Sequence, residues 1–111
     1  MHQESKKICK ITSEILLYLM SQGYYKVVFD IDVKDHIFTL KFNLKNVPKD
    51  VILYMDRKIN SEREYEIEEY GWELMGESTE SNELEMIGLI VDKLEIEQKG
   101  DTTYFTLIRK G

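Results

Sequence analysis

A strict alternation of apolar and polar residues over positions 38–45 constrains the fold more than any other feature of this sequence. The apolar members are Phe38, Leu40, Phe42 and Leu44, and the polar members are Thr39, Lys41, Asn43 and Lys45. A period of two places all the apolar side chains on one face of a β-strand. The sequence therefore predicts a strand that is covered on one face and wet on the other.

The same period begins earlier in the chain and indicates a β-hairpin. Over residues 27–34 the apolar positions are Val27, Phe29, Ile31 and Val33. Asp35 and His36 separate the two alternations and are predicted to form the turn. A second hairpin is predicted near the end of the chain, with strands at 94–98 and 102–109 joined by a turn at 99–101.

Helical spacing marks three further segments. Residues 4–21 carry apolar residues at helical spacing, followed by a glycine stop at Gly23: Ile8, Ile11, Ile15, Leu16, Leu19 and Met20. Pro48 suits the first turn of a helix over residues 49–59. A third helix, capped by Ser81 or Asn82, is apolar on nearly every side and is predicted to be buried.

The order of these elements is α-ββ-α-(x)-α-ββ, where (x) denotes residues 62–80. This order predicts an α+β fold, a two-layer α/β sandwich with the helices on one face of a four-stranded, mainly antiparallel sheet. A chain of 111 residues is the size of one domain, so residues 1–111 are expected to form a single domain. The strand edges at 24–34 or 102–109 make a homodimer possible.

Charge composition excludes some classes of partner. The chain has 15 basic and 21 acidic residues, a formal net charge of −6, and residues 61–85 alone contain ten Glu and one Arg. Such a surface repels phosphate backbones and anionic membranes, so no nucleic-acid or membrane partner is expected. The lone Cys9 excludes an intramolecular disulfide and, with no apolar segment long enough to span a membrane, favours the cytoplasm.

Motifs that would carry catalysis or metal binding are missing from the sequence. His2, His36 and Cys9 have no metal-ligand spacing, and no glycine-rich phosphate loop or nucleophile elbow occurs. Cys9 is interpreted as a buried small hydrophobe, and His36 as an exposed turn residue. No metal or cofactor is therefore predicted.

The acidic stretch at residues 62–77 contains the most distinctive side chains of the chain. Its aromatic residues are Tyr65, Tyr70 and Trp72, and they stand among glutamates such as Glu73. Tyr and Trp anchors surrounded by charge are typical of protein interfaces. These four residues are the candidates for partner binding, and the alternative is that the aromatic rings close over the core.

Two stretches resemble the ATP-binding domain of the histidine-kinase/gyrase/Hsp90 superfamily, in particular the small anti-sigma-factor kinases. Residues 13–24 are similar to the family's first box, in which a Glu precedes an Asn by four residues and the helix ends in His-Gly-Tyr. Glu14 matches the Glu that activates water, and Gly23-Tyr24 match the helix end. Residues 85–107 resemble the family's C-terminal ending, with Gly88-Leu89 at the helix start.

The resemblance implies an ATPase scaffold whose functional residues have changed. Tyr18 stands where the family has its Mg²⁺-binding Asn, and Gln22 replaces the His. The family's second box, an Asp and two glycines after the second strand, corresponds here to residues 42–48, which contain neither residue type. The glycine-rich lid is also missing. The stretch 65–78 in addition resembles small uncharacterised proteins of anaerobic Firmicutes-type bacteria, which imply no activity.

These observations favour a small cytoplasmic protein that is not an enzyme. The expected function is a non-catalytic regulatory or protein-interaction domain on a degenerate kinase-like scaffold. One alternative is a diverged Mg·ATP-binding kinase or ATPase of the anti-sigma-factor type, with Glu14 as its base. The other is a domain that binds a small ligand in an apolar pocket between sheet and helices.

Overall fold

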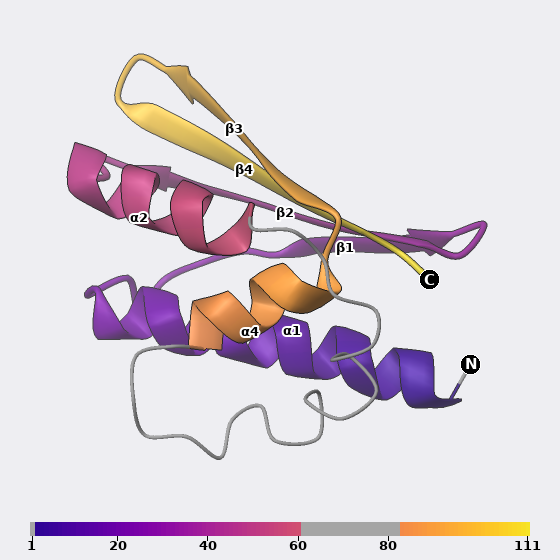
Figure 1. The fold of residues 1–111 in the computed structure, drawn as a ribbon. Coiled ribbons are helices and arrows are strands. Elements are labelled where there is room, and N and C mark those ends of the chain that lie inside the picture. Colours follow the sequence, from indigo (N-terminus) through magenta and orange to yellow (C-terminus); the bar gives the residue numbers. More distant parts are fainter. Residues whose placement is uncertain (1, 61–82) are drawn as a thin grey trace.

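The computed structural model describes residues 2–60 and 83–111. Its helices and strands, in chain order, are α1 (His2–Ser21), β1 (Asp30–Lys34), β2 (Ile37–Lys45), α2 (Lys49–Ile59), α4 (Glu83–Ile90), β3 (Lys93–Lys99) and β4 (Thr102–Lys110). The strands form a four-stranded antiparallel sheet in the order β1-β2-β4-β3. All three helices lie on one face of this sheet (Figure 1). The predicted α+β fold is therefore confirmed.

The core lies between the sheet and the helices. Strand β2 pairs with β4 so that Leu40 lies opposite Leu107 and Phe42 opposite Phe105, and residues directly opposite one another share a face. The rings of Phe42 and Phe105 stack with their centroids 4.8 Å apart. The predicted covered face of β2 is confirmed, since the four apolar residues on that face are buried: Phe38, Leu40, Phe42 and Leu44.

Helix α1 buries a narrower stripe than its apolar residues suggest. Ile11, Ile15 and Leu19 are buried, whereas Leu16 and Met20 are 38% and 40% exposed. The buried residues follow one another at a spacing of four, and Leu16 and Met20 lie beside this stripe. Helix α4 packs against both α1 and α2 and is buried as predicted, with Leu84, Ile87 and Ile90 in the core. Its proposed caps at Ser81 and Asn82 lie outside the described residues.

Gly23 ends α1 as the sequence predicts. The amide of Gly23 donates to the carbonyl of Met20, and the amide of Tyr24 donates to that of Leu19. These two bonds form a Schellman motif, which needs a residue in the left-handed region at its centre. Gly23 supplies it with a φ of 92°.

We expect Gly23→Ala to lower the free energy of unfolding by about 1–2 kcal/mol, the cost of a left-handed backbone at a residue with a Cβ. A Cβ at this position meets no atom within 4 Å, so the loss comes from the backbone alone. Asn tolerates this conformation better, and Gly23→Asn should therefore lose less. Urea denaturation of the two variants measures the difference, and equal stability of Gly23→Ala and the parent would contradict it.

Helix α2 has the predicted bounds, and the residue that caps its C-terminus connects it to the sheet. Asn60 follows α2 and its Nδ2 donates to the carbonyl of Leu94 over 2.8 Å, while the Leu94 amide donates to Oδ1 over 2.7 Å. Strand β3 lies at one edge of the sheet. The Asn60 amide therefore occupies the outer side of that edge, as a neighbouring strand would.

Strand β1 differs from the prediction in length and cover. It begins at Asp30 rather than at residue 27, and all five of its residues are exposed. Phe29 precedes it and contacts Phe42 edge to face. The prediction that 102–109 forms a sheet edge is wrong, because β4 lies between β2 and β3. Helices pack on the central strands, and β1 extends beyond their cover.

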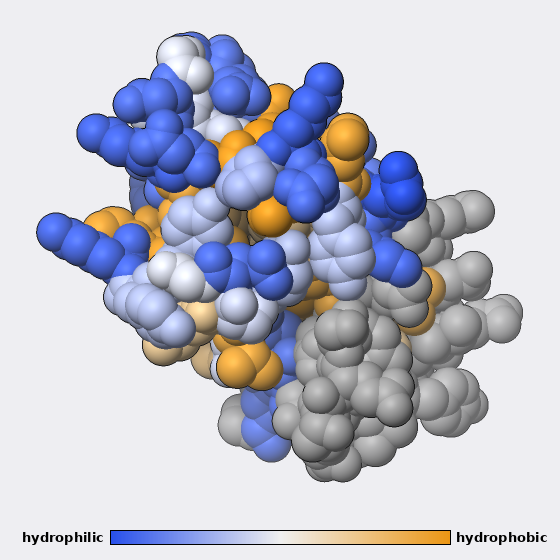
Figure 2. All heavy atoms as spheres, turned by 90° about the vertical axis from the view of Figure 1, so that its left-hand side faces the viewer, coloured by the Kyte–Doolittle hydropathy of each residue, from blue (hydrophilic) through white to orange (hydrophobic). Residues whose placement is uncertain are grey.

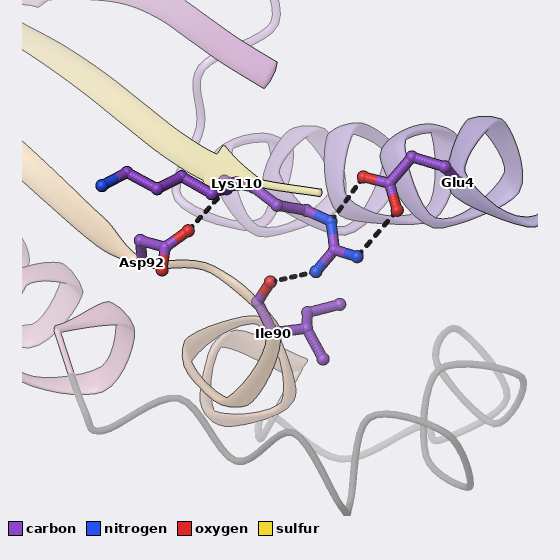
Figure 3. Close-up of polar contacts among 5 residues, drawn as sticks. Glu4, Ile90, Asp92 and Lys110 are labelled. Atoms are coloured by element: carbon purple, nitrogen blue, oxygen red, sulfur yellow. Dashed lines mark hydrogen bonds and ion pairs between the residues drawn. The ribbon is translucent and has the colours of Figure 1, made fainter. Parts of the chain in front are cut away.

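A buried arginine joins the end of β4 to the first turn of α1 and the end of α4. The guanidinium of Arg109 donates to both carboxylate oxygens of Glu4 over 2.8 Å and to the carbonyl of Ile90 (Figure 3). Only 2% of the Arg109 side chain is exposed, against 23% for Glu4. Close by, the Lys110 amide donates to the carboxylate of Asp92. This cluster connects the first turn of α1, the end of α4 and the last strand.

Within residues 2–60 and 83–111, no helix is long and apolar enough to cross a membrane.

Candidate functional site

A groove between the C-terminal half of α1 and the outer side of α2 has a volume of about 590 Å³. Seven residues line it: Tyr18, Gln22, Asp50, Val51, Leu53, Tyr54 and Arg57. Figure 2 looks onto the end of the molecule where α1 ends and α2 begins, and there apolar and hydrophilic residues alternate over the surface. We call this feature the α1–α2 groove.

Two tyrosines form an aromatic wall in the α1–α2 groove. Tyr18 of α1 and Tyr54 of α2 stack with their ring centroids 5.7 Å apart and their planes 22° apart. Lys58, one turn further along α2, places its ammonium 5.8 Å from the Tyr54 centroid, within reach of a cation–π interaction. The stacked rings connect the two helices and offer a surface that is apolar with polar tips.

Helix α2 gives the groove opposite charges at its two ends. Asp50, Leu53 and Arg57 follow one another at helical spacings of three and four, so they share one face of α2. Asp50 lies in the first turn and Arg57 in the last, roughly 10 Å apart along the axis. Leu53 between them is 48% exposed. The wall therefore presents an acid, an exposed apolar side chain and a base in a row.

The Tyr18 hydroxyl is held in its neutral form. Burial, followed by the nearby Tyr54, Asp50 and Tyr24, raises the pKa of Tyr18 from 10.0 to about 12. Because this pKa is higher in the folded state, its contribution to stability is complete below about pH 10 and is lost as the pH rises from about 10 to 12.

We therefore expect Tyr18 to stay protonated at a pH at which free tyrosine is half ionised, about 10. NMR of protein labelled at the tyrosine ring carbons measures each tyrosine separately, and Tyr18→Phe assigns the signal. Half-ionisation of Tyr18 at about pH 10 would contradict the raised pKa.

Glu14, the only candidate for a catalytic base, lies on α1 one turn before Tyr18. Its side chain is 4% exposed, and it is not among the residues that line the α1–α2 groove. The four candidates for partner binding, Tyr65, Tyr70, Trp72 and Glu73, lie outside the described residues.

The metal-ligand candidates lie apart from the groove. Cys9 is exposed, so its interpretation as a buried hydrophobe is wrong. It occupies the outward side of α1, away from the stripe of Ile11 and Ile15. His36 is exposed in the β1–β2 turn as predicted. The described part of the chain brings no three His, Cys, Asp or Glu residues together in a metal-binding arrangement.

The residues that α2 contributes to the groove were not predicted from the sequence. Leu53, Tyr54 and Arg57 lie outside the apolar face by which this helix was recognised. The helical spacing of Asp50, Leu53 and Arg57 can be read from the sequence. These residues form one wall of a groove only because residues of α1 line the other side. Gln22, which the resemblance aligned with a histidine, is also a lining residue.

No protein-family model, curated protein or solved structure matches this chain. The resemblance of residues 13–24 and 85–107 to the ATPase superfamily therefore stays a prediction from the sequence.

Proposed function

We propose that this chain is a non-catalytic regulatory or protein-interaction domain on a degenerate kinase-like ATPase scaffold. The α1–α2 groove is its docking surface, and the partner presents an amphipathic helix. The observation that carries this proposal is the position of Tyr18. The residue aligned with the family's Mg²⁺-binding Asn is a neutral phenol stacked on Tyr54 at 5.7 Å.

The residues in place of the nucleotide machinery do not fit Mg·ATP. A phenol whose pKa is raised to about 12 is a poor ligand for Mg²⁺, which prefers carboxylate and other hard oxygen donors. The residues at the position of the second box do not fit a nucleotide either, because Phe42 and Leu44 are core residues. At the end of that segment the backbone N–H of Asn46 donates to the carbonyl of Asp101. We therefore derive no catalytic step.

The chemistry of the groove favours a helix as its occupant. A helix that lies along a groove between two helices is read through an apolar anchor and flanking charges. Leu53 and the Tyr18–Tyr54 stack receive the anchor. Asp50 and Arg57 select a helix with a base and an acid roughly 10 Å apart, about two turns of its own length.

A photoreactive residue at position 53 tests this proposal in the native host. Tyr104 on the open face of the sheet is the matched control, because it is 43% exposed against 48% for Leu53. We expect a crosslinked protein adduct from position 53 and none from position 104. Arg57→Glu should reduce the adduct at 53. Equal crosslinking from both positions, or none from 53, would contradict the groove as docking surface.

The acidic aromatic stretch provides a second surface in this proposal. Trp72→Ala and Tyr70→Ala should weaken capture of the same partner while the domain stays folded. Loss of folding in both variants would instead make these residues part of the core. The crosslinking at position 53 is independent of that outcome.

The surroundings that fit this function are the reducing cytoplasm and a protein partner. Cys9 is an exposed thiol and persists unmodified where thiols are kept reduced. The net charge of −6 disfavours nucleic acid and anionic lipid as partners.

A further inference from the structure

The two edges of the sheet differ in how they are covered. At the β3 edge, the side chain of Asn60 forms hydrogen bonds with the backbone C=O and N–H of Leu94, over 2.8 and 2.7 Å. At the other edge all five residues of β1 are exposed. An exposed strand edge is a template for a further strand. The β1 edge is therefore where this sheet can be extended.

The side chains of β1 are only partly used by its neighbour β2. Asp30 lies opposite Lys41, but Asp32 lies opposite the neutral Thr39 and Lys34 opposite the neutral Ile37. Ile31 and Val33 share the helix-facing side of the sheet, yet they are 47% and 46% exposed. The strand thus presents two charges without a cross-strand counterion and two apolar side chains that are half exposed.

The turn decides which backbone groups of β1 point outward. Lys34 and Ile37 flank the two-residue turn of Asp35 and His36. In such a hairpin the flanking pair exchanges backbone hydrogen bonds, and the pattern alternates along the strand. The N–H and C=O groups of Val33 and Ile31 therefore point away from β2 and are available to a new strand.

We propose that a second copy of this chain pairs antiparallel with β1, with the two-fold axis through Val33. In this register Val33 lies opposite Val33 of the second copy, and Asp32 lies opposite Lys34 on both sides of the axis. A two-fold axis normal to the sheet passes through one residue of β1, and residues at equal distances before and after it then lie opposite each other. Each of the five residues of β1 therefore corresponds to one possible register. The result is a continuous eight-stranded sheet with the helices of both copies on one face.

The charges of β1 select this register over the other four. An axis through Asp30, Asp32 or Lys34 places a charged side chain opposite its own copy. An axis through Ile31 places Asp30 opposite Asp32 twice. Like charges directly opposite one another destabilise a sheet, and unlike charges stabilise it. Only the axis through Val33 avoids every like-charge pair. Because the ladder is short, the dimer is small and its population depends on concentration.

A charge exchange tests this register by sedimentation equilibrium over a concentration series. Asp32→Lys and Lys34→Asp each create two like-charge pairs, so we expect each variant alone to dimerise about tenfold more weakly or worse than the parent. When the two variants are mixed, every pair across the axis is again of unlike charge, and heterodimers should form. Lys45→Asp, on the open face of β2, makes the same change in charge as Lys34→Asp but away from the edge, and it should dimerise like the parent.

A parent protein that stays monomeric at every concentration would overturn the proposal. So would single variants that dimerise as well as the parent, or a mixture that stays monomeric. Recovery in the mixture also requires that both variants are folded, which separates lost pairing from lost folding. The α1–α2 groove shares no residue with β1, so this inference goes beyond the proposed function and can fail without it.

Discussion

Replacement of Arg109 by Ala is expected to lower the free energy of unfolding by about 3–5 kcal/mol, the usual cost of breaking a buried charge pair. Arg109 is 1% exposed overall. Its guanidinium makes two hydrogen bonds to Glu4 and one to the carbonyl of Ile90. The substitution removes these bonds and leaves a cavity where α1, α4 and β4 meet. In a domain of this size the loss corresponds to a fall in Tm of roughly 12–20 °C.

Three further variants show whether the charge pair causes this loss. Glu4→Ala removes the carboxylate and leaves the Arg109 charge buried, so it should also destabilise strongly. Replacing Arg109 and Glu4 together by Met should cost less than the sum of the single changes, because neither charge is left behind. Lys45→Ala, an exposed cation of β2, should change the stability by less than 0.5 kcal/mol, as about that is typical of surface positions. Comparable thermal stability of Arg109→Ala and Lys45→Ala would contradict the account.

Asn60→Ala is expected to lower the free energy of unfolding by about 2–3 kcal/mol, from the lost hydrogen bonds to Leu94 and Asp56 and the unsatisfied groups that remain. The Asn60 side chain bonds both the amide and the carbonyl of Leu94, 34 residues further along the chain. It is also the contact that occupies the outer edge of β3. Chemical denaturation measures the loss in stability.

Asn60→Asp separates the two bonds of this contact. It keeps an acceptor for the Leu94 amide but has no N–H for the Leu94 carbonyl or for the Asp56 carboxylate, to which Asn60 Nδ2 also donates over 2.7 Å. We therefore expect Asn60→Asp to be less stable than the parent. Asn43→Ala, on the exposed face of β2, is the matched control and should be nearly neutral. If Asn60→Ala is as stable as Asn43→Ala, the Asn60–Leu94 contact contributes nothing to the stability, contrary to this prediction.

The elements with a strict period were predictable from the sequence. The alternation from Phe38 to Leu44 located β2 and its buried face, and the bounds of α2 followed from Pro48 and the apolar spacing. Gly23 marked the end of α1 because few other residues adopt a φ of 92°. In each case a local pattern and the global packing require the same residue type.

The departures from prediction arose where tertiary position outweighs local pattern. Ile31 and Val33 have the alternation of a covered strand, but β1 extends beyond the helices and they stay half exposed. Cys9 was assigned to the core from its helix alone, yet it lies outside the buried stripe of α1. The register of β4 places Arg109 on the same face as Phe105 and Leu107. A charged residue at an apolar position of the alternation indicates a buried ion pair. The partner Glu4 could not be predicted, because it lies 105 residues away in the sequence.

The candidate site was less predictable than the fold. Tyr18 was singled out from its alignment with a metal-binding position, and it does line the α1–α2 groove. Its partner Tyr54 could not be named, because the stack depends on how α2 packs beside α1. The charges of Asp50 and Arg57 become a recognition pattern only once α1 closes the other side of the groove.

Thermal melts with and without Mg·ATP test the central claim, that the scaffold carries no nucleotide site, most directly. A ligand at a hundred times its Kd stabilises a domain by about 2.7 kcal/mol, which a melt detects easily. We predict identical melting curves with no nucleotide, with Mg·ADP and with Mg·ATP. A clear rise in Tm with either nucleotide would show that a binding site survives despite Tyr18, and it would contradict the proposal of a non-catalytic interaction domain.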